Sequence, residues 1–304
     1  MTASGQQLSA RAARTAWTVL ESTAEKFPSR FALQQPLGGG KYRSWTWREY
    51  ANSVRQIAVG LRASGVAKGE IVALQSETRA EFYLADMAVL ACGAISAALY
   101  TSLPSAEQAA TLRTSNARVA FVENEKTRRA LEEAAGPEPL VVRWILLTGG
   151  GPDCQTLESL RAQGERILKD DPRAFEKILG EFDDSDLAIL YMTSGATGLP
   201  KMGLVTHRAL VANIDMGPQV LPLSPEDATI AFLPSAHIAQ RVVVELLPAR
   251  EGACVWFSEG LSKLPHEFKA IRPTFFLAPP RVWERVYSSV CAEIRKRPAP
   301  LRAL

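Results

Sequence analysis

Residues 186–201 read DLAILYMTSGATGLPK, and this stretch decides how the fold is interpreted. Residues 186–192 are mostly apolar, which is typical of a short strand buried on both faces of a parallel sheet. Three hydroxyl residues and two glycines follow, and a lysine stands three positions after the second glycine. Glycines let the backbone approach a phosphate closely, while hydroxyl and lysine side chains add donors and positive charge. The stretch therefore predicts a strand that leads into a polyphosphate-binding loop.

This loop differs from the two common phosphate-binding patterns. In the pattern G-x-x-x-x-G-K-[ST] a glycine directly precedes the lysine, whereas Gly198 is followed here by Leu199 and Pro200. The stretch also lacks the G-x-G-x-x-G pattern of dinucleotide-binding folds. Judged by residue types alone, an ordinary turn after the strand remains the alternative. The position favours binding, because ligands of open α/β sheets bind beyond the carboxyl ends of the strands.

Short apolar segments alternate with helical periods on both sides of this stretch. The apolar segments predict strands over residues 71–75, 94–100, 118–122, 140–147, 186–192, 229–233, 254–257 and 274–277. Helices are predicted over 48–65, 79–91, 105–115 and 206–215, and after residues 237, 261 and 280. The polar residues 149–186 predict a long connection that carries two helices. The alternation predicts an α/β protein with doubly wound, mostly parallel sheets, in two successive subdomains over residues 1–185 and 186–304.

Composition narrows the class of protein. The chain has 304 residues, of which 47% are hydrophobic, and 35 basic residues against 32 acidic ones give a net charge of +3. So small an excess gives no reason to expect a nucleic-acid partner. Four cysteines without a C-x-x-C pair predict reduced thiols and a cytoplasmic location. The longest mostly apolar stretch, 87–100, is shorter than the roughly 20 residues that cross a bilayer, so no transmembrane segment is predicted.

Several stretches together resemble one known superfamily. YMTSGATGLPK (191–201), followed by THRAL, resembles the signature TSG[ST]TGxPKG of adenylate-forming (AMP-binding) enzymes. FLPSAHIAQRVV (232–243) looks like the LPLAHxxER element of long-chain acyl-CoA synthetases. KAIRPTFFLAPPRVWERVYSSV (269–290) looks like their KPTxFxxVPRxxEKxY element. Earlier stretches, among them AEKFPSRFALQ (24–34) and SWTWREYANSVRQIAVGLRASGVAKGEIVAL (44–74), resemble the same superfamily. The elements thus occur in the family's order from about residue 17 to about residue 290, and they are most similar to long-chain fatty acid–CoA ligases.

The resemblance implies a reaction and a set of site residues. The family uses ATP to activate a carboxylate as an acyl-adenylate and then transfers the acyl group to CoA. The partners implied are a fatty acid, ATP and CoA, with Mg²⁺ as a cofactor. Lys201 and His237 are the catalytic candidates, and His237 would lie beside the acyl and nucleotide pockets. On residue type alone, His237 would instead be a helix-starting residue packed under the sheet. The residues implied to bind the ATP phosphates are Thr193, Ser194, Gly195, Ala196, Thr197, Gly198 and Lys201.

This sequence departs from the family pattern in two ways. Two positions of the loop differ, and several of the family's later segments are not found in it. Ala196 stands where the family has Thr or Ser, and Met202-Gly203 stands where one glycine normally follows the lysine. Residues 1–304 contain no match to the family's later Y-G-x-[ST]-E and T-G-D segments or to its C-terminal domain. The resemblance therefore implies the N-terminal part of a ligase, with the Mg²⁺ ligand elsewhere and no activity of this part alone.

Two other functions remain as alternatives. One is an aryl- or medium-chain acyl-CoA ligase from the same superfamily, and the other is a non-catalytic nucleotide-binding or interaction module. A fatty-acid substrate is compatible with peripheral contact with a membrane. The sequence gives no indication of the oligomeric state.

Overall fold

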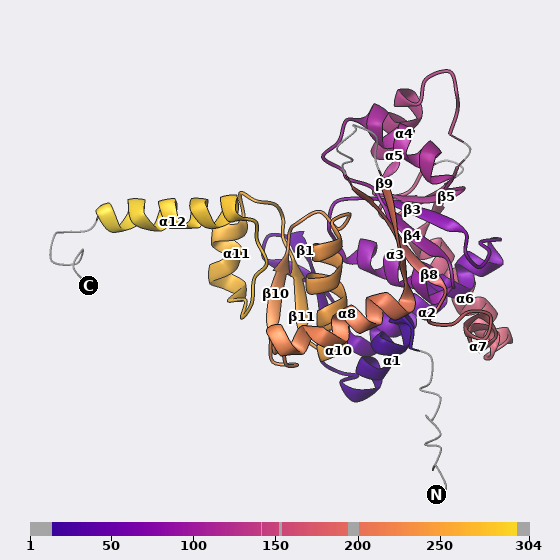
Figure 1. Cartoon of the computed structure of the whole chain (residues 1–304), viewed down its shortest axis with the longest axis horizontal. Helices are drawn as coiled ribbons and strands as arrows, with labels where there is room; N and C mark the ends of the chain where they lie inside the picture. Colours follow the sequence, from indigo (N-terminus) through magenta and orange to yellow (C-terminus); the bar gives the residue numbers. More distant parts are fainter. Residues whose placement is uncertain (1–13, 141, 152–153, 194–200, 297–304) are drawn as a thin grey trace, which may run out of the picture.

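The structure is a computed structural model that describes residues 14–140, 142–151, 154–193 and 201–296. Its strands form one sheet of seven and one sheet of four. Figure 1 shows the larger sheet beside the smaller one, with helices around both and the last helix, α12 (Pro280–Arg295), extending away from the rest. The predicted α/β class is thus confirmed.

The larger sheet has the strand order β7-β6-β5-β3-β4-β8-β9. Each neighbouring pair is parallel except β8 and β9, which are antiparallel. The chain order reverses around β3, with β4 on one side and β5 on the other, and such a switch point is where open α/β sheets bind ligands. The strands are β3 (Ile71–Gln75), β4 (Ile95–Ala98), β5 (Val119–Val122), β6 (Arg143–Leu146), β7 (Gln155–Thr156), β8 (Leu187–Thr193) and β9 (Lys201–Thr206).

The smaller sheet combines strands from distant parts of the chain. Its order is β10-β11-β1-β2, where β1 (Phe31–Gly38) and β2 (Lys41–Thr46) form a hairpin beside β11 (Cys254–Phe257) and β10 (Ala228–Ala231). The hairpin turns through Gly38, Gly39 and Gly40, whose φ angles of 82°, 61° and 76° favour glycine. Since β8 and β9 belong to the larger sheet, the division between the sheets does not follow the predicted boundary between residues 185 and 186.

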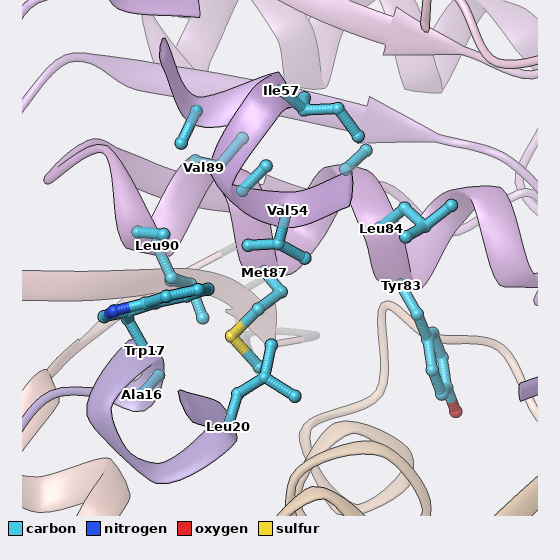
Figure 2. Packing of buried hydrophobic residues seen from close by; sticks show 14 of the residues in the cluster. Ala16, Trp17, Leu20, Val54, Ile57, Tyr83, Leu84, Met87, Val89 and Leu90 are labelled. Carbon is cyan, nitrogen blue, oxygen red and sulfur yellow. The ribbon is translucent and has the colours of Figure 1, made fainter. Parts of the chain in front are cut away.

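Helix α3 (Ala80–Ala91) is the centre of the hydrophobic core, because all twelve of its residues are buried. Figure 2 shows side chains from α1 (Ala16–Lys26) and α2 (Trp47–Ala63) packing against it. The remaining helical segments are α4 (Ser105–Ser115), α5 (Glu125–Ala134), α6 (Leu157–Asp170), α7 (Ala174–Leu179), α8 (His207–Val220), α9 (Ile238–Gln240), the π-helix η1 (Arg241–Leu246), α10 (Leu247–Glu251) and α11 (Leu264–Ile271).

Most predicted elements are confirmed, but one predicted strand is wrong and several strands were not predicted. The predicted strand over 274–277 is not a strand: the Thr274 and Phe275 N–H groups both donate to the same Ala228 carbonyl of β10, and the flanking Pro273 and Pro279 lack the N–H groups that a ladder needs. Residues 201–206 form strand β9, which the sequence analysis did not predict. The helix predicted over 206–215 is α8, and Thr206 caps it by accepting a hydrogen bond from the Ala209 N–H.

The crossing of α2 and α6 gives a test of the fold. A Cβ atom at Gly164 would lie 1.8 Å from the Gln56 carbonyl oxygen, so an alanine there forces the two helices apart. We expect Gly164→Ala to lower the free energy of unfolding by about 3 kcal/mol, as overpacking of a tight contact does. Urea denaturation measures the change. Gly180→Ala is the matched control, because its Cβ would make only ordinary contacts at 3.5 Å. Equal stabilities of the two variants would contradict the close approach.

Candidate functional site

The predicted phosphate-binding loop connects two paired strands. β8 ends at Thr193, β9 begins at Lys201, and these two residues are direct partners in the antiparallel register. Because β8 runs parallel to β4, Thr193 lies at the carboxyl edge of the larger sheet. The structure thus brings together the two ends of the predicted site. Five predicted site residues lie outside the described residues: Ser194, Gly195, Ala196, Thr197 and Gly198.

The Met202-Gly203 departure has a structural reason at its second residue. Gly203 in β9 is the register partner of Tyr191 in β8. A Cβ atom at Gly203 would lie 2.4 Å from Cζ of the Tyr191 ring, so that ring occupies the space that a side chain would need. Met202 is 48% exposed. The glycine of this segment is therefore retained one position later, where it makes room for an aromatic ring directly beside the loop.

A polar cluster lines the ends of β3 and β5 next to the switch point. The Glu123 carboxylate, which follows β5, accepts hydrogen bonds from the Ser76 hydroxyl at 3.2 Å and from the Glu77 N–H at 2.9 Å. Arg79 lies 3.9 Å from the same carboxylate and pairs with Glu81 at 2.8 Å. The sequence analysis did not select these residues, although polar residues directly after two predicted strands were a usable signal.

The same edge contacts the segment that follows β10. Thr78 donates a hydrogen bond from its hydroxyl to the Leu233 carbonyl, and its Oγ1 lies 2.8 Å from Oγ of Ser235. These bonds connect the β3–α3 turn to the FLPSAH stretch across more than 150 residues of sequence. The predicted site residue His237 is the last residue of this stretch.

His237 begins helix α9, as one of its two interpretations predicted, but it is exposed rather than packed under the sheet. Its Nδ1 accepts a hydrogen bond from the Ala239 N–H at 3.2 Å. In the neutral ring this assignment places the proton on Nε2, which makes that atom a donor directed away from the helix. His237 can therefore offer one N–H group to an oxygen of a ligand.

The other two histidines have different environments. His207 is fully buried, accepts a hydrogen bond from the Ala16 N–H at 3.3 Å, and lies against Phe182. Burial lowers its pKa to about 4, so the ring is neutral at pH 7. His266 is exposed on α11. His207 is thus a packing residue.

The described residues hold neither a metal cluster nor a membrane span. Among them, no three histidine, cysteine, aspartate or glutamate side chains are grouped so that they could bind a metal ion. In the same part of the chain, no helix is both long enough and apolar enough to cross a bilayer. The four cysteines are unpaired.

Comparison with known proteins decides the family. The family model for the AMP-binding enzyme matches residues 20–303, which is nearly the whole chain. The chain belongs to the AMP-binding enzyme family. This confirms the resemblance inferred from the loop and from the two later elements.

The curated relatives of this AMP-binding enzyme chain are acyl-CoA ligases. It is 30% identical to the long-chain-fatty-acid–CoA ligase FadD15 of Mycobacterium tuberculosis, over 85% of this chain and 42% of that protein. It is 29% identical to the peroxisomal long chain acyl-CoA synthetase 7 of Arabidopsis thaliana, over 84% of this chain and 37% of that protein. The chain thus spans about two-fifths of the length of these relatives.

Solved structures confirm the fold. A putative long-chain-fatty-acid CoA ligase from Rhodopseudomonas palustris superposes with a TM-score of 0.75 at 20% identity, over 91% of this chain and 66% of that one. The anthranilate CoA ligase AuaEII superposes with a TM-score of 0.78 at 22% identity, over 90% of this chain and 51% of that one. The chain therefore has the architecture of the N-terminal region of adenylate-forming enzymes.

Proposed function

We propose that the chain is the N-terminal part of an ATP-dependent long-chain fatty acid–CoA ligase. Such an enzyme joins a fatty-acid carboxylate to the α-phosphate of ATP with release of pyrophosphate, and then transfers the acyl group to the thiol of CoA with release of AMP. The observation that carries the proposal is the pairing of Thr193 with Lys201, because it sets both ends of a family-matched phosphate loop at the carboxyl edge of a parallel sheet. The identity to long-chain ligases supports the choice of substrate.

The proposed roles follow from the chemistry of the residues. Lys201 offers a positive charge to the phosphates of ATP, and the loop that precedes it offers backbone N–H groups and hydroxyls. His237 offers its Nε2–H to a carboxylate or phosphate oxygen, because its Nδ1 is engaged by the Ala239 N–H. Mg²⁺ would neutralise further phosphate charge. Its ligand is proposed to be the acid of the family's Y-G-x-[ST]-E segment, which residues 1–304 do not contain.

Two alternative functions remain, one within the enzyme family and one outside enzymes. Within the family, an aryl- or medium-chain acyl-CoA ligase uses the same chemistry with another acyl pocket. Outside enzymes, a nucleotide-binding module would bind ATP without turnover. A cytoplasmic location, with peripheral contact with a membrane that holds the substrate, is part of the proposal and is supported by the four unpaired cysteines.

We expect residues 1–304 by themselves to bind ATP but to form no acyl-CoA. Adenylation concentrates negative charge around the α-phosphate, and groups that stabilise such charge together act far more than additively. These residues match none of the family's later acidic segments. The assay supplies ATP, Mg²⁺, CoA and palmitate and measures palmitoyl-CoA. Robust turnover would refute the proposal that essential groups lie elsewhere.

A chimeric enzyme tests the function itself. In it, residues 1–290 of this chain are followed by the matching C-terminal part of the Mycobacterium tuberculosis ligase FadD15. We expect this chimeric enzyme to catalyse ATP–pyrophosphate exchange that depends on palmitate. ATP binding without exchange, in a chimera whose folding is verified by its circular dichroism, would instead support the nucleotide-binding module.

A further inference from the structure

A buried ionic cluster joins α3 to the π-helix that follows His237. Asp86 of α3 and Arg241 of η1 are 0% and 1% exposed. The guanidinium donates to both carboxylate oxygens, with Nε 3.1 Å from Oδ2, and the Ser96 hydroxyl donates to the same carboxylate. A bidentate pair of this kind fixes both the separation and the orientation of the two elements. None of the roles assigned above uses it.

Glu245 adds a second buried carboxyl group to the cluster. Its side chain is buried beside Asp86 and Arg241 and interacts electrostatically with both. Burial, and then the negative charge of Asp86, raise the pKa of Glu245 well above its usual value. Burial thus favours the neutral form of Glu245, and the carboxylate that Arg241 contacts directly is that of Asp86.

The cluster stabilises an uncommon backbone. In η1 the Leu247 N–H donates to the Val242 carbonyl five residues earlier, which is the wide turn of a π-helix. Such turns are rare and are retained where the surrounding structure holds them. Arg241 is the first residue of this turn, and its N–H donates to the His237 carbonyl at 3.2 Å. The position of His237 thus depends on where Arg241 is held.

His237 lies between two attachments to one helix. On its N-terminal side, Ser235 contacts Thr78 just before α3. On its C-terminal side, Gln240 donates to the Tyr83 hydroxyl at 3.4 Å, and Arg241 pairs with Asp86. The intervening α9 has only three residues, and so short a helix is not stable without contacts to the rest of the fold. The central core helix therefore determines where this exposed imidazole stands.

We propose that Asp86 and Arg241 are positioning residues that hold His237 in its capping geometry and so direct its Nε2–H toward the ligand. The inference rests on the proposed function for the role of His237 toward a ligand, but the placement itself is independent of it. The two can be tested separately.

Diethyl pyrocarbonate reports the geometry of His237. The reagent acylates the imidazole nitrogen that carries the lone pair, which in His237 is the Nδ1 atom engaged by the Ala239 N–H. The modification rate at each histidine is measured by peptide mass spectrometry on the 304-residue chain at pH 7. We expect Asp86→Asn to raise the rate at His237 about fivefold, the factor that corresponds to loss of one capping bond. The exposed His266 should keep its rate, and the buried His207 should stay protected.

Two further variants keep the test decisive. Glu245→Gln keeps the shape of the side chain and leaves the contact between Asp86 and Arg241 in place, so the rate at His237 should not change. If Asp86→Asn exposes His207 and is thus unfolded, Arg241→Lys replaces it, because lysine keeps the charge but loses the two-pronged contact. An unchanged rate at His237 in the folded variant, or an equal rise in Glu245→Gln, would overturn the proposal.

Protection by ligands separates this inference from the proposed function. Palmitate and ATP with Mg²⁺ are added to the unmodified chimeric enzyme before the reagent. Slower modification of His237 supports its role toward the ligand. Absence of protection would remove that role, while the result for Asp86→Asn still decides whether Asp86 and Arg241 position the ring.

Discussion

The chimeric enzyme is expected to use palmitate at least about a thousandfold better than acetate, measured as kcat/KM. Each buried methylene is worth about 0.8 kcal/mol, which is roughly a factor of four, so five methylenes in a matching tunnel already give this ratio. The segments of this chain that resemble the long-chain group are 232–243 and 269–290. The series runs from acetate through hexanoate and decanoate to stearate, with benzoate included.

A second chimera shows which part of the enzyme sets the preference. It carries the C-terminal part of the anthranilate CoA ligase AuaEII in place of the long-chain one. If this chain supplies the acyl pocket, both chimeras prefer palmitate. A peak at acetate or benzoate in both would contradict the long-chain assignment, and a peak at benzoate would favour the aryl-CoA ligase.

Lys201→Ala is expected to lower the rate of acyl-adenylate formation in the chimeric enzyme by about 10²–10³-fold. Removing one preorganised donor to charge that develops in a transition state typically has an effect of this size. Palmitate-dependent ATP–pyrophosphate exchange measures it. Met202→Ala is the matched control, because Met202 is the neighbouring residue of β9, is 48% exposed and carries no charge.

The separate effects of Lys201→Ala on kcat and on the KM for ATP indicate how Lys201 acts. A lower kcat with an unchanged KM for ATP means that the lysine acts on the transition state, whereas a higher KM alone means that it only binds the nucleotide. Exchange by Lys201→Ala at the rate of Met202→Ala would remove Lys201 from the site.

Local patterns predicted most of the core elements because periodicity is a property of neighbouring residues. The run at 71–75 became β3 with the predicted bounds, and the apolar spacing over 48–65 became α2. The hairpin of β1 and β2 was missed, although its three consecutive glycines signal a turn. The strand at 201–206 was also missed, because its partner β8 supplies the pairing that its own short and glycine-containing sequence does not.

For the candidate site, the sequence by itself determined the family and the residue types of the phosphate loop, since both depend on motifs that are contiguous in the chain. It also selected His237, through the element that surrounds it. Only the tertiary structure decided that Thr193 pairs with Lys201, that Thr78 contacts Ser235, and that Asp86 holds Arg241.

The physical reason is the distance along the chain between the partners. Asp86 and Arg241 are 155 positions apart, and a lone aspartate in an apolar helix carries no signal of the arginine that neutralises it. The pairing of these buried charges is decided when α3 and the π-helix pack together. Desolvation makes an unpaired charge there too costly to retain. The sequence thus determined the residue types of the loop, and the packing around α3 decided where His237 stands.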